Sequence, residues 1–552
     1  MTHGFDVVVV GAGAGGAAAA YRLVQSGARV LLLEAGPRFS AFEDYPLTNG
    51  DWERHIFPEK PGSQATVEFG DLGKLDPAFA DLKTWETHQR NVQPEVGQAR
   101  PANTAKYSHV QGVGGTTLHF VGEAHRLHPQ SLARPMAKPE VGGWPVSYAE
   151  LEPYYSTCEH TIGVACDRPD AHRWRSEPYP MDAHPISPGG SELMAAGKRI
   201  SRPWEVNPRA VNSAFYDDRP ACNYCGQCSR GCPLGDKGSA DVTFIRKALE
   251  TGRLTLIANA PVLALKQSKT GEIESVQYKH NGEQKTVETP VLMLAAGAVQ
   301  TPRLLLLSAD TSQPEGIANG SGQVGKNFME TLWWSSSGTV PGLKNSHMGL
   351  PAEVTDWSRT APGSVPGVKG GFKLSHTTLD IGLNGPIGFA KRMVGGFGRG
   401  FKQRLRDSFG SALSVTAIGQ TVVDERSYIA LSASQRDHLG LPVAQINSVL
   451  TENSFQLLRA MANACREVLG AANTQILEER SSYDQFVSTH VFGTARMGRD
   501  PAHSVVDAFG RSHDHPNLFI CDASVFPTTG GGEAPALTIM ALATRAAEHA
   551  LK

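Results

Sequence analysis

The chain opens with the stretch FDVVVVGAGAGG at residues 5–16. Its run of β-branched residues predicts a short buried strand. The glycines that follow predict a tight turn, and the alanine-rich residues 13–25 predict a helix. A second apolar run at residues 28–34 predicts the next strand. Together these segments form one βαβ unit, which is typical of a parallel α/β sheet.

The glycine spacing within this unit is that of a dinucleotide-binding turn. Gly11 permits the tight turn, Gly13 lets a pyrophosphate approach the backbone, and Gly16 allows close packing of helix on strand. The helix N-terminus then offers free N–H groups to phosphates. Glu34 ends the second strand, eighteen residues after Gly16, where a carboxylate can accept from ribose hydroxyls. A glycine-rich packing turn is the alternative interpretation, and the motif alone does not separate FAD from NAD.

Length and composition narrow the class of protein. A chain of 552 residues with 40% hydrophobic and 19% charged residues is expected to form at least two globular domains. The sum of Lys and Arg is 52 and that of Asp and Glu is 54, a net charge of −2, which argues against a general nucleic-acid binder. No run of 18 apolar residues predicts a membrane-spanning helix. The first residues do not resemble a secretion signal.

Further segments complete the predicted organisation. Residues 37–107 are irregular in pattern and could cover a site. Residues 342–400 are rich in glycine and predict loops on a substrate-side domain. Short strands are expected at residues 254–257, 262–266, 275–280 and 291–295, and a last strand and helix at 517–521 and 537–551. A helical spacing places Cys465 on a buried helix face. A nucleotide-binding domain assembled from separated segments fits this order best.

Three later segments carry a resemblance to a known family. Residues 111–120 read QGVGGTTLHF, residues 294–302 read LAAGAVQTP, and HVFGTARMG at 490–498 precedes DASVFP at 522–527. With the N-terminal unit, these ordered motifs resemble the glucose–methanol–choline (GMC) flavoprotein oxidoreductases across essentially the whole chain.

The resemblance implies an α/β fold with two domains. A Rossmann-like FAD-binding domain would comprise residues 1–140, 210–330 and 485–552, and a mixed sheet-plus-helix substrate-binding domain residues 141–209 and 331–484. The cofactor implied is FAD. The helix after Pro535 would direct its N-terminus toward the flavin, where it stabilises negative charge. In addition to the N-terminal residues, the positions implied to contact FAD are Gly114, Gly115, Thr116, Thr117, Val262, Asp522 and Ala523.

In the resembled family, the histidine that opens the 490–498 motif takes the proton of the substrate hydroxyl, which identifies His490 as the predicted catalytic base. An imidazole suits this role because its pKa lies near neutrality. Val491 replaces the usual proline. Ala534 stands where the family has a second catalytic Asn or His. Either His490 works alone, or Glu533 or a water substitutes, or the change inactivates the site.

His119 matches the position at which some sugar-oxidising relatives attach FAD covalently. A histidine that packs beside the flavin without a covalent link is the equally weighted alternative. The mass of the denatured protein separates the two, because a covalent link adds the mass of FAD to the polypeptide.

Four of the eight cysteines lie within residues 222–232, in the stretch CNYCGQCSRGCP at 222–233. The spacing C-x2-C-x2-C-x3-C-P is the bacterial ferredoxin pattern and favours an iron–sulfur cluster over zinc, with unmetallated thiols as the remaining alternative. The resemblance implies a three-iron, four-sulfur cluster on Cys222, Cys228 and Cys232. Cys225 would be spare, or the fourth ligand of a four-iron cluster.

These observations predict an FAD-dependent dehydrogenase that oxidises a CH–OH group of a sugar, glycoside or related alcohol. Electrons would leave through the iron–sulfur cluster to a cytochrome or quinone-side acceptor. A GMC-type oxidase that uses dioxygen is one alternative, and a redox-silent lyase or binding protein of the same fold is another. The resemblance implies a small accessory subunit. It allows a cytoplasmic location, or a periplasmic one reached by co-export with a signal-bearing partner.

Overall fold

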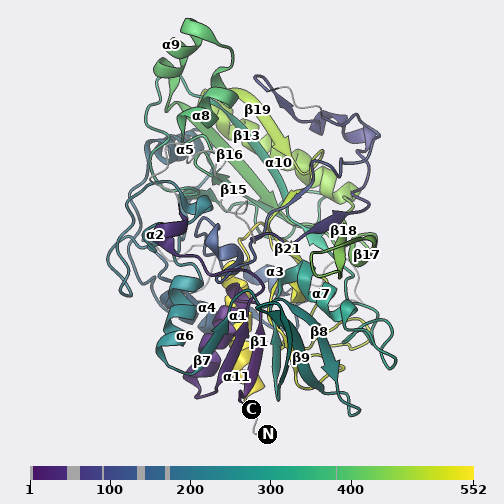
Figure 1. Ribbon diagram of the computed structural model, residues 1–552. Helices are drawn as coiled ribbons and strands as arrows, with labels where there is room; N and C mark the ends of the chain where they lie inside the picture. Colours follow the sequence, from purple (N-terminus) through teal and green to yellow (C-terminus); the bar gives the residue numbers. More distant parts are fainter. Residues whose placement is uncertain (1–3, 46–62, 90–92, 134–142, 168–174, 381) are drawn as a thin grey trace.

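The structure is a computed structural model that describes residues 4–45, 63–89, 93–133, 143–167, 175–380 and 382–552. Part of the predicted irregular excursion at 37–107 therefore lies outside the described residues. Figure 1 shows a parallel sheet with its helices at the end of the molecule where the N- and C-termini lie, and a second, larger sheet at the opposite end.

The parallel sheet is built from strands that lie far apart in the sequence. Its order is β22-β11-β1-β2-β7, and every neighbouring pair is parallel. All residues of its two N-terminal strands are buried, as expected for strands covered on both faces. These strands confirm the predicted βαβ unit and the predicted strands at 254–257, 291–295 and 517–521. The strand bounds are β1 Val7–Val10, β2 Val30–Leu33, β7 Leu254–Ile257, β11 Leu292–Leu294 and β22 Leu518–Ile520.

Helices α1 (Ala14–Gln25) and α11 (Ala536–Ala550) pack against each other beside this sheet, and α4 (Tyr148–Ile162) packs on α11. Alanine-rich sequences let α1 and α11 approach closely, and their alanines are almost all buried. A small antiparallel sheet of β8 (Val262–Gln267), β9 (Ile273–His280) and β10 (Glu283–Glu288) joins the same apolar core.

The second sheet has the order β4-β19-β13-β16-β15-β14-β6, with all its pairs antiparallel. Helix α10 (Glu452–Ala471) packs on β13 and β16, and Cys465 lies on its buried face as predicted. This sheet and helix form a second apolar core. The strand bounds are β4 Trp85–Glu86, β6 Trp204–Val206, β13 Leu332–Thr339, β14 Val354–Asp356, β15 Phe372–His376, β16 Ala412–Gly419 and β19 Gln475–Ser481.

The expectation of loops throughout residues 342–400 is wrong in part, because β14 and β15 lie within this range. The sequence of β15, FKLSH, carries polar side chains on a strand whose residues are all buried. The strand does alternate, since Phe372 and Leu374 join the second apolar core while Lys373 and Ser375 contact buried polar groups. The glycine-rich composition of the range led to the expectation of loops, although this short alternation is a strand signal.

The remaining elements are short or peripheral. Strands β3 (Val67–Phe69), β17 (Tyr428–Arg436) and β18 (Pro442–Asn447) form one sheet, and β12 (Met329–Glu330) with β21 (Val491–Phe492) and β5 (Lys106–Tyr107) with β20 (Val487–Ser488) form two small ones. The other α-helices are α2 Ala41–Asp44, α3 Pro129–Ala133, α5 Pro188–Arg199, α6 Arg246–Glu250, α7 Gly297–Leu307, α8 Pro386–Phe389 and α9 Gly398–Ser408.

The two cores bear on the predicted division into domains. The parallel sheet takes strands from three separated segments, in keeping with a discontinuous nucleotide-binding domain. Helix α4 falls in the range 141–209 predicted for the substrate-binding domain, yet its Leu151, Tyr155 and Ile162 belong to the core of the parallel sheet. The exact domain boundaries stay a prediction. In the part of the chain that the structure describes, no helix combines the length and apolarity needed to cross a membrane.

Candidate active site

A single cavity of about 940 Å³ brings together residues from both ends of the sequence. Glu34 and Val262 lie on its wall, as do His490 and Ala534. The volume is at the upper end of the range for small-molecule sites. Of the residues predicted from sequence, those that line it are Gly11, Gly13, Glu34, Gly115, Thr116, Thr117, His119, Val262, His490, Asp522 and Ala523.

The first glycine turn places the start of α1 at this cavity. Gly11 has φ +97°, which side chains rarely tolerate. A Cβ added to Gly16 would lie 1.8 Å from the carbonyl oxygen of Gly11, so this helix sits directly on the end of β1. No side chain caps α1 at Gly13 among the described residues. The free N–H groups of its first turn are therefore available to an anion.

Glu34 braces two turns at once. Its carboxylate accepts the N–H groups of Ala12 (2.8 Å), Gly36 (2.9 Å) and Gly112 (3.0 Å). Burial raises the pKa of Glu34 to about 7, while these three backbone donors act in the opposite direction. Glu34 therefore also has a structural role that the sequence motif did not indicate. It holds the turns at 11–16 and 111–117 together, in addition to its predicted contact with a ribose.

The second glycine turn lies against the first. The N–H of Gly114 donates to the carbonyl oxygen of Ala12, and a Cβ on Gly115 would lie 2.6 Å from the Cα of Gly13. The hydroxyl of Thr117 donates to the carbonyl of Gly114 at 2.6 Å and accepts from the N–H of Ala240, so it serves this turn. Gly114 and Gly16 lie behind the residues that line the cavity.

His119 and Asp522 occupy different surroundings on the cavity wall. The Nε2 atom of His119 is buried and has no hydrogen-bond partner among the described residues, and burial lowers the pKa of the imidazole to about 3. The carboxylate of Asp522 accepts from the hydroxyl of Thr301 and from the N–H groups of Gly297 and Ser524. Asp522 therefore ties the end of β22 to the start of α7.

His490 immediately precedes β21 and lies on the cavity wall. Its carbonyl oxygen accepts from the N–H and hydroxyl of Thr331 and the hydroxyl of Ser488, which fixes the backbone. Its ring has no hydrogen-bond partner within the described residues. Burial lowers the pKa of His490 to about 4, so the imidazole is neutral at pH 7 and able to accept a proton.

Ala534 lines the cavity at the position where a second catalytic side chain is expected, and it contributes only a methyl group there. Its N–H donates to Nδ1 of His125 at 2.9 Å. The neighbouring carboxylate of Glu533 accepts the N–H groups of His128 and Gly531 and does not line the cavity. The structure therefore gives no support to Glu533 as a substitute for the missing catalytic side chain.

A charged group that the sequence analysis missed lies on the same wall. The carboxylate of Glu123 pairs with Lys373, accepts from the amide of Asn207 at 2.9 Å and lies 3.7 Å from Nε2 of His125. The neighbouring Lys373 and His125 hold the pKa of Glu123 well below its ordinary value, in spite of burial. The alternation of Glu123 and His125 directly after the second glycine turn was the available sequence signal.

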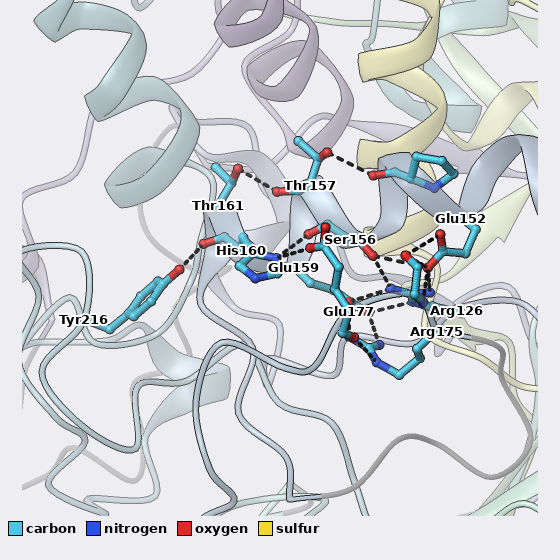
Figure 2. A network of polar contacts seen from close by, with 12 residues as sticks. Arg126, Glu152, Ser156, Thr157, Glu159, His160, Thr161, Arg175, Glu177 and Tyr216 are labelled. Carbon is cyan, nitrogen blue, oxygen red and sulfur yellow. Dashed lines mark hydrogen bonds and ion pairs between the residues drawn. The ribbon is translucent and has the colours of Figure 1, made fainter.

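The segment that carries Glu123 and His125 is anchored on its other side by α4. Figure 2 shows the guanidinium groups of Arg126 and Arg175 meeting at the carboxylate of Glu159. This carboxylate is fully buried and bound by both arginines at 2.6–2.9 Å. Because paired donors fix both distance and orientation, the network holds residues 123–126 rigidly against the helix.

We expect replacement of Lys373 by methionine to destabilise the fold by about 3–5 kcal/mol, because it leaves the carboxylate of Glu123 buried and unpaired. Urea unfolding followed by tryptophan fluorescence measures the loss. The double replacement Glu123→Gln with Lys373→Met should recover much of it. Equal destabilisation of the single and double variants would show that the ion pair is not the cause.

The four clustered cysteines lie in the described part of the chain, around Asp236. The thiol of Cys232 donates to Oδ1 of Asp236 at 3.0 Å. Burial raises the pKa of the Cys228 thiol to about 11 and raises those of the other three as well. Among the described residues, no three His, Cys, Asp or Glu side chains are placed to hold a metal ion. The predicted iron–sulfur site is therefore not supported by this arrangement.

Comparison with known proteins places this cavity in context. Models of the GMC oxidoreductase family match residues 5–332 and 423–543. The large subunit of fructose dehydrogenase from Gluconobacter japonicus is 28% identical, over 99% of this chain and 97% of its own length. The 6'''-hydroxyparomomycin C oxidase of Streptomyces lividus is 30% identical, over 98% and 90%. The structure of pyridoxine 4-oxidase from Mesorbium loti superposes with a TM-score of 0.63 at 18% identity, over 99% of this chain and 98% of that one. The chain therefore belongs to the GMC oxidoreductase family, flavin enzymes that act on the CH–OH groups of alcohols and sugars.

Proposed function

We propose that this protein oxidises a CH–OH group of a sugar, glycoside or related alcohol, with FAD bound in the cavity and His490 as the base. The observation that carries the proposal is the neutral imidazole of His490, which has no hydrogen-bond partner in the described ranges and lines the same cavity as the two glycine turns. The relatives support the substrate class, since they include a fructose dehydrogenase subunit and an oxidase of a paromomycin derivative.

The residues present fit FAD. The start of α1 is uncapped by any described side chain, and a side chain at Gly115 would fill the space against Gly13. These two features leave room and donors for a pyrophosphate. Glu34 and the backbone at Val262 would hold the adenosine part, and residues 114–117, Asp522 and Ala523 the remainder. The N-terminus of α11 borders the cavity at Pro535 and Ala536. When bound, FAD supplies a two-electron acceptor for the hydride of the carbinol carbon.

His490 performs the proton part of this reaction. Its unprotonated ring nitrogen accepts the hydroxyl proton of the substrate as the C–H bond is broken. Burial lowers the pKa of His490, the carboxylate of Glu123 acts to raise it, and Lys373 acts to lower it. The carboxylate thus favours the protonated form that this transfer produces, and the lysine opposes it. The hydrogen bonds from Thr331 and Ser488 to the carbonyl oxygen of His490 fix the backbone that carries the ring.

The lowered pKa of His490 predicts the pH dependence of catalysis. The protonated imidazole cannot accept a proton, so activity is lost as pH falls through the pKa of about 4 and not through 6.5. We therefore expect the acid limb of kcat/KM at about pH 4, with little dependence on His490 between pH 5 and 8. Anaerobic stopped-flow reduction, followed from below pH 4 up to pH 8, measures the position of this limb. An acid limb near pH 6.5 would contradict the structure.

The role of His119 is a finer part of the proposal. Its buried Nε2 has no partner among the described residues and borders the cavity, which supports contact with the flavin. Whether this contact is a covalent bond is decided by the mass of the denatured chain.

The route of the electrons after FAD is a separate proposal. The spacing of Cys222, Cys225, Cys228 and Cys232 supports an iron–sulfur cluster (3Fe-4S ahead of 4Fe-4S), while their arrangement here does not, and no step is derived through such a group. Iron and acid-labile sulfide in protein purified without oxygen would establish it. One relative is named as a subunit, the large subunit of fructose dehydrogenase, which supports an accessory subunit together with a cytochrome or other one-electron acceptor. Such an assembly could lie in the cytoplasm or be co-exported to the periplasm.

The experiment that tests the function is anaerobic bleaching of the bound flavin by a panel of sugars, glycosides and aliphatic alcohols. Bleaching identifies a CH–OH oxidoreductase and its preferred substrate. Reoxidation of the reduced enzyme by dioxygen at catalytic rates identifies the oxidase alternative, whereas reoxidation only by one-electron acceptors identifies a dehydrogenase. Failure of every substrate to bleach the flavin would overturn the proposal in favour of a lyase or binding protein.

A further inference from the structure

One carboxylate on the cavity wall is left without a function by the reaction described so far. Asp380 follows β15 by four residues and lines the cavity with His490 and Glu123. Its Oδ1 atom is buried and has no hydrogen-bond partner, and no ion pair holds this carboxylate among the described residues. Native proteins satisfy nearly all of their buried polar atoms, so such an exception calls for an explanation.

Asp380 shares the cavity wall with the candidate base. Asp380, Glu123 and His490 all line the cavity, and the charges of Glu123 and Lys373 act on both Asp380 and His490. Arg209 also acts on Asp380, but no hydrogen bond joins them within the described residues. The guanidinium of Arg209 is buried and donates from Nη2 to the carbonyl of Val121, while its Nε and Nη1 have no partner in the described segments.

The family's usual second side chain is absent at this end of the cavity. Ala534 contributes only a methyl group, and its N–H is already bound to His125. Glu123 is bound by Lys373 and Asn207. Among the described residues, Asp380 is therefore the carboxylate near this ion pair with an oxygen, Oδ1, that remains available to a ligand. A carboxylate oxygen is an acceptor and requires a donor, such as a hydroxyl or an ammonium group.

We propose that Asp380 binds a second hydrogen-bond donor of the substrate, a hydroxyl or ammonium group beyond the CH–OH group that is oxidised. A buried carboxyl oxygen that receives no hydrogen bond from the described residues costs stability. A residue kept at such a cost is expected to bind a ligand and not to stabilise the fold. The inference rests on the proposed function and deepens it. It specifies a polyhydroxylated or amino-substituted substrate over a simple alcohol.

The test compares Asp380→Asn with wild-type enzyme on D-glucose and D-fructose, on their monodeoxy and aminodeoxy derivatives, and on ethanol. For the sugars we expect KM to rise roughly 10-fold in the variant, because the amide keeps one acceptor oxygen but loses the charge that strengthens the hydrogen bond. The deoxy derivative that lacks the bound hydroxyl should already have a high KM with the wild-type enzyme, and the replacement of Asp380 should raise that KM little further. A larger loss for the aminodeoxy sugar than for its parent identifies ammonium as the donor. With ethanol, kcat/KM should stay within about threefold, because ethanol has no second donor to lose.

Thermal unfolding distinguishes a binding role of Asp380 from a structural one, because the two roles predict different changes in melting temperature. The melting temperature of Asp380→Asn should equal or exceed that of wild type, while the increase produced by saturating sugar should disappear. Asp407→Asn, on the exposed side of α9, is the matched control. It should keep the wild-type melting temperature and its increase with sugar. A lower melting temperature with equal losses on every substrate, or an unchanged KM for the sugars, would overturn the inference. A sugar-dependent increase without flavin bleaching would support the Asp380 site and overturn the oxidation.

Discussion

Replacement of His490 by alanine is expected to slow reduction of the flavin by the preferred alcohol on the order of 10²–10⁴-fold, with FAD still bound. The imidazole is neutral and faces the cavity, and its ring has no protein partner within the described residues. Its loss removes the proton acceptor and little packing. Because Ala534 supplies no second acceptor or donor side chain, the loss should fall toward the upper end of this range.

Anaerobic stopped-flow absorbance at the flavin band measures the effect on the chemical step directly. The replacement His503→Ala, at an exposed histidine paired with Asp500, serves as the control and should leave the rate unchanged. The FAD content of both variants must match that of wild type. Reduction of the His490→Ala variant at a rate within threefold of wild type would show that another group takes the proton.

Replacement of Gly16 by alanine is expected to destabilise the protein by about 3 kcal/mol or more and to abolish stable FAD binding. The added Cβ would lie 1.8 Å from the carbonyl oxygen of Gly11 and 3.0 Å from its carbonyl carbon. Both atoms belong to the backbone of a tight turn, so the neighbour cannot rotate away as a side chain could. Helix α1 would have to move off β1, and with it the N–H groups at the cavity.

Flavin absorbance of the purified chain and urea unfolding measure the two consequences. Gly470→Ala is the matched control because it lies within α10, and a Cβ there meets no atom within 4 Å. That replacement should stabilise the helix by up to about 1 kcal/mol. A Gly16→Ala variant that binds FAD as wild type does would show that α1 can shift without loss of the site.

The N-terminal unit illustrates what local pattern can predict. The strand at residues 7–10 and helix α1 occur where the alternation of apolar run, glycine turn and alanine-rich segment predicts them. Local sequence suffices here because strand, turn and helix are adjacent in the chain and each has its own residue preference. The same holds for His490, whose identity as a candidate base depends on a motif of nine consecutive residues.

The charged residues of the catalytic end were not predictable in the same way. Lys373 lies on the polar face of a short alternating strand, a pattern that does not reveal its partner, and Glu123 comes from a segment 250 residues earlier. Asp380 acquires its significance only because no neighbour in the described part of the chain donates a hydrogen bond to its Oδ1 atom. The cysteine spacing is a local pattern that favours a metal cluster, yet in the described residues it does not place three ligands together. A local motif therefore does not by itself establish a metal site.

The amino-acid sequence alone thus determined the family, the cofactor-binding unit and the candidate base, because these depend on residues that are close in the chain or on ordered motifs. Tertiary structure decided which of the distant polar groups share the cavity and which of them already have partners. The physical reason is that burial and hydrogen bonding are properties of the packed molecule. A carboxylate forms a salt bridge, holds a turn or stays available as an acceptor according to the neighbours that the fold brings to it from elsewhere in the chain.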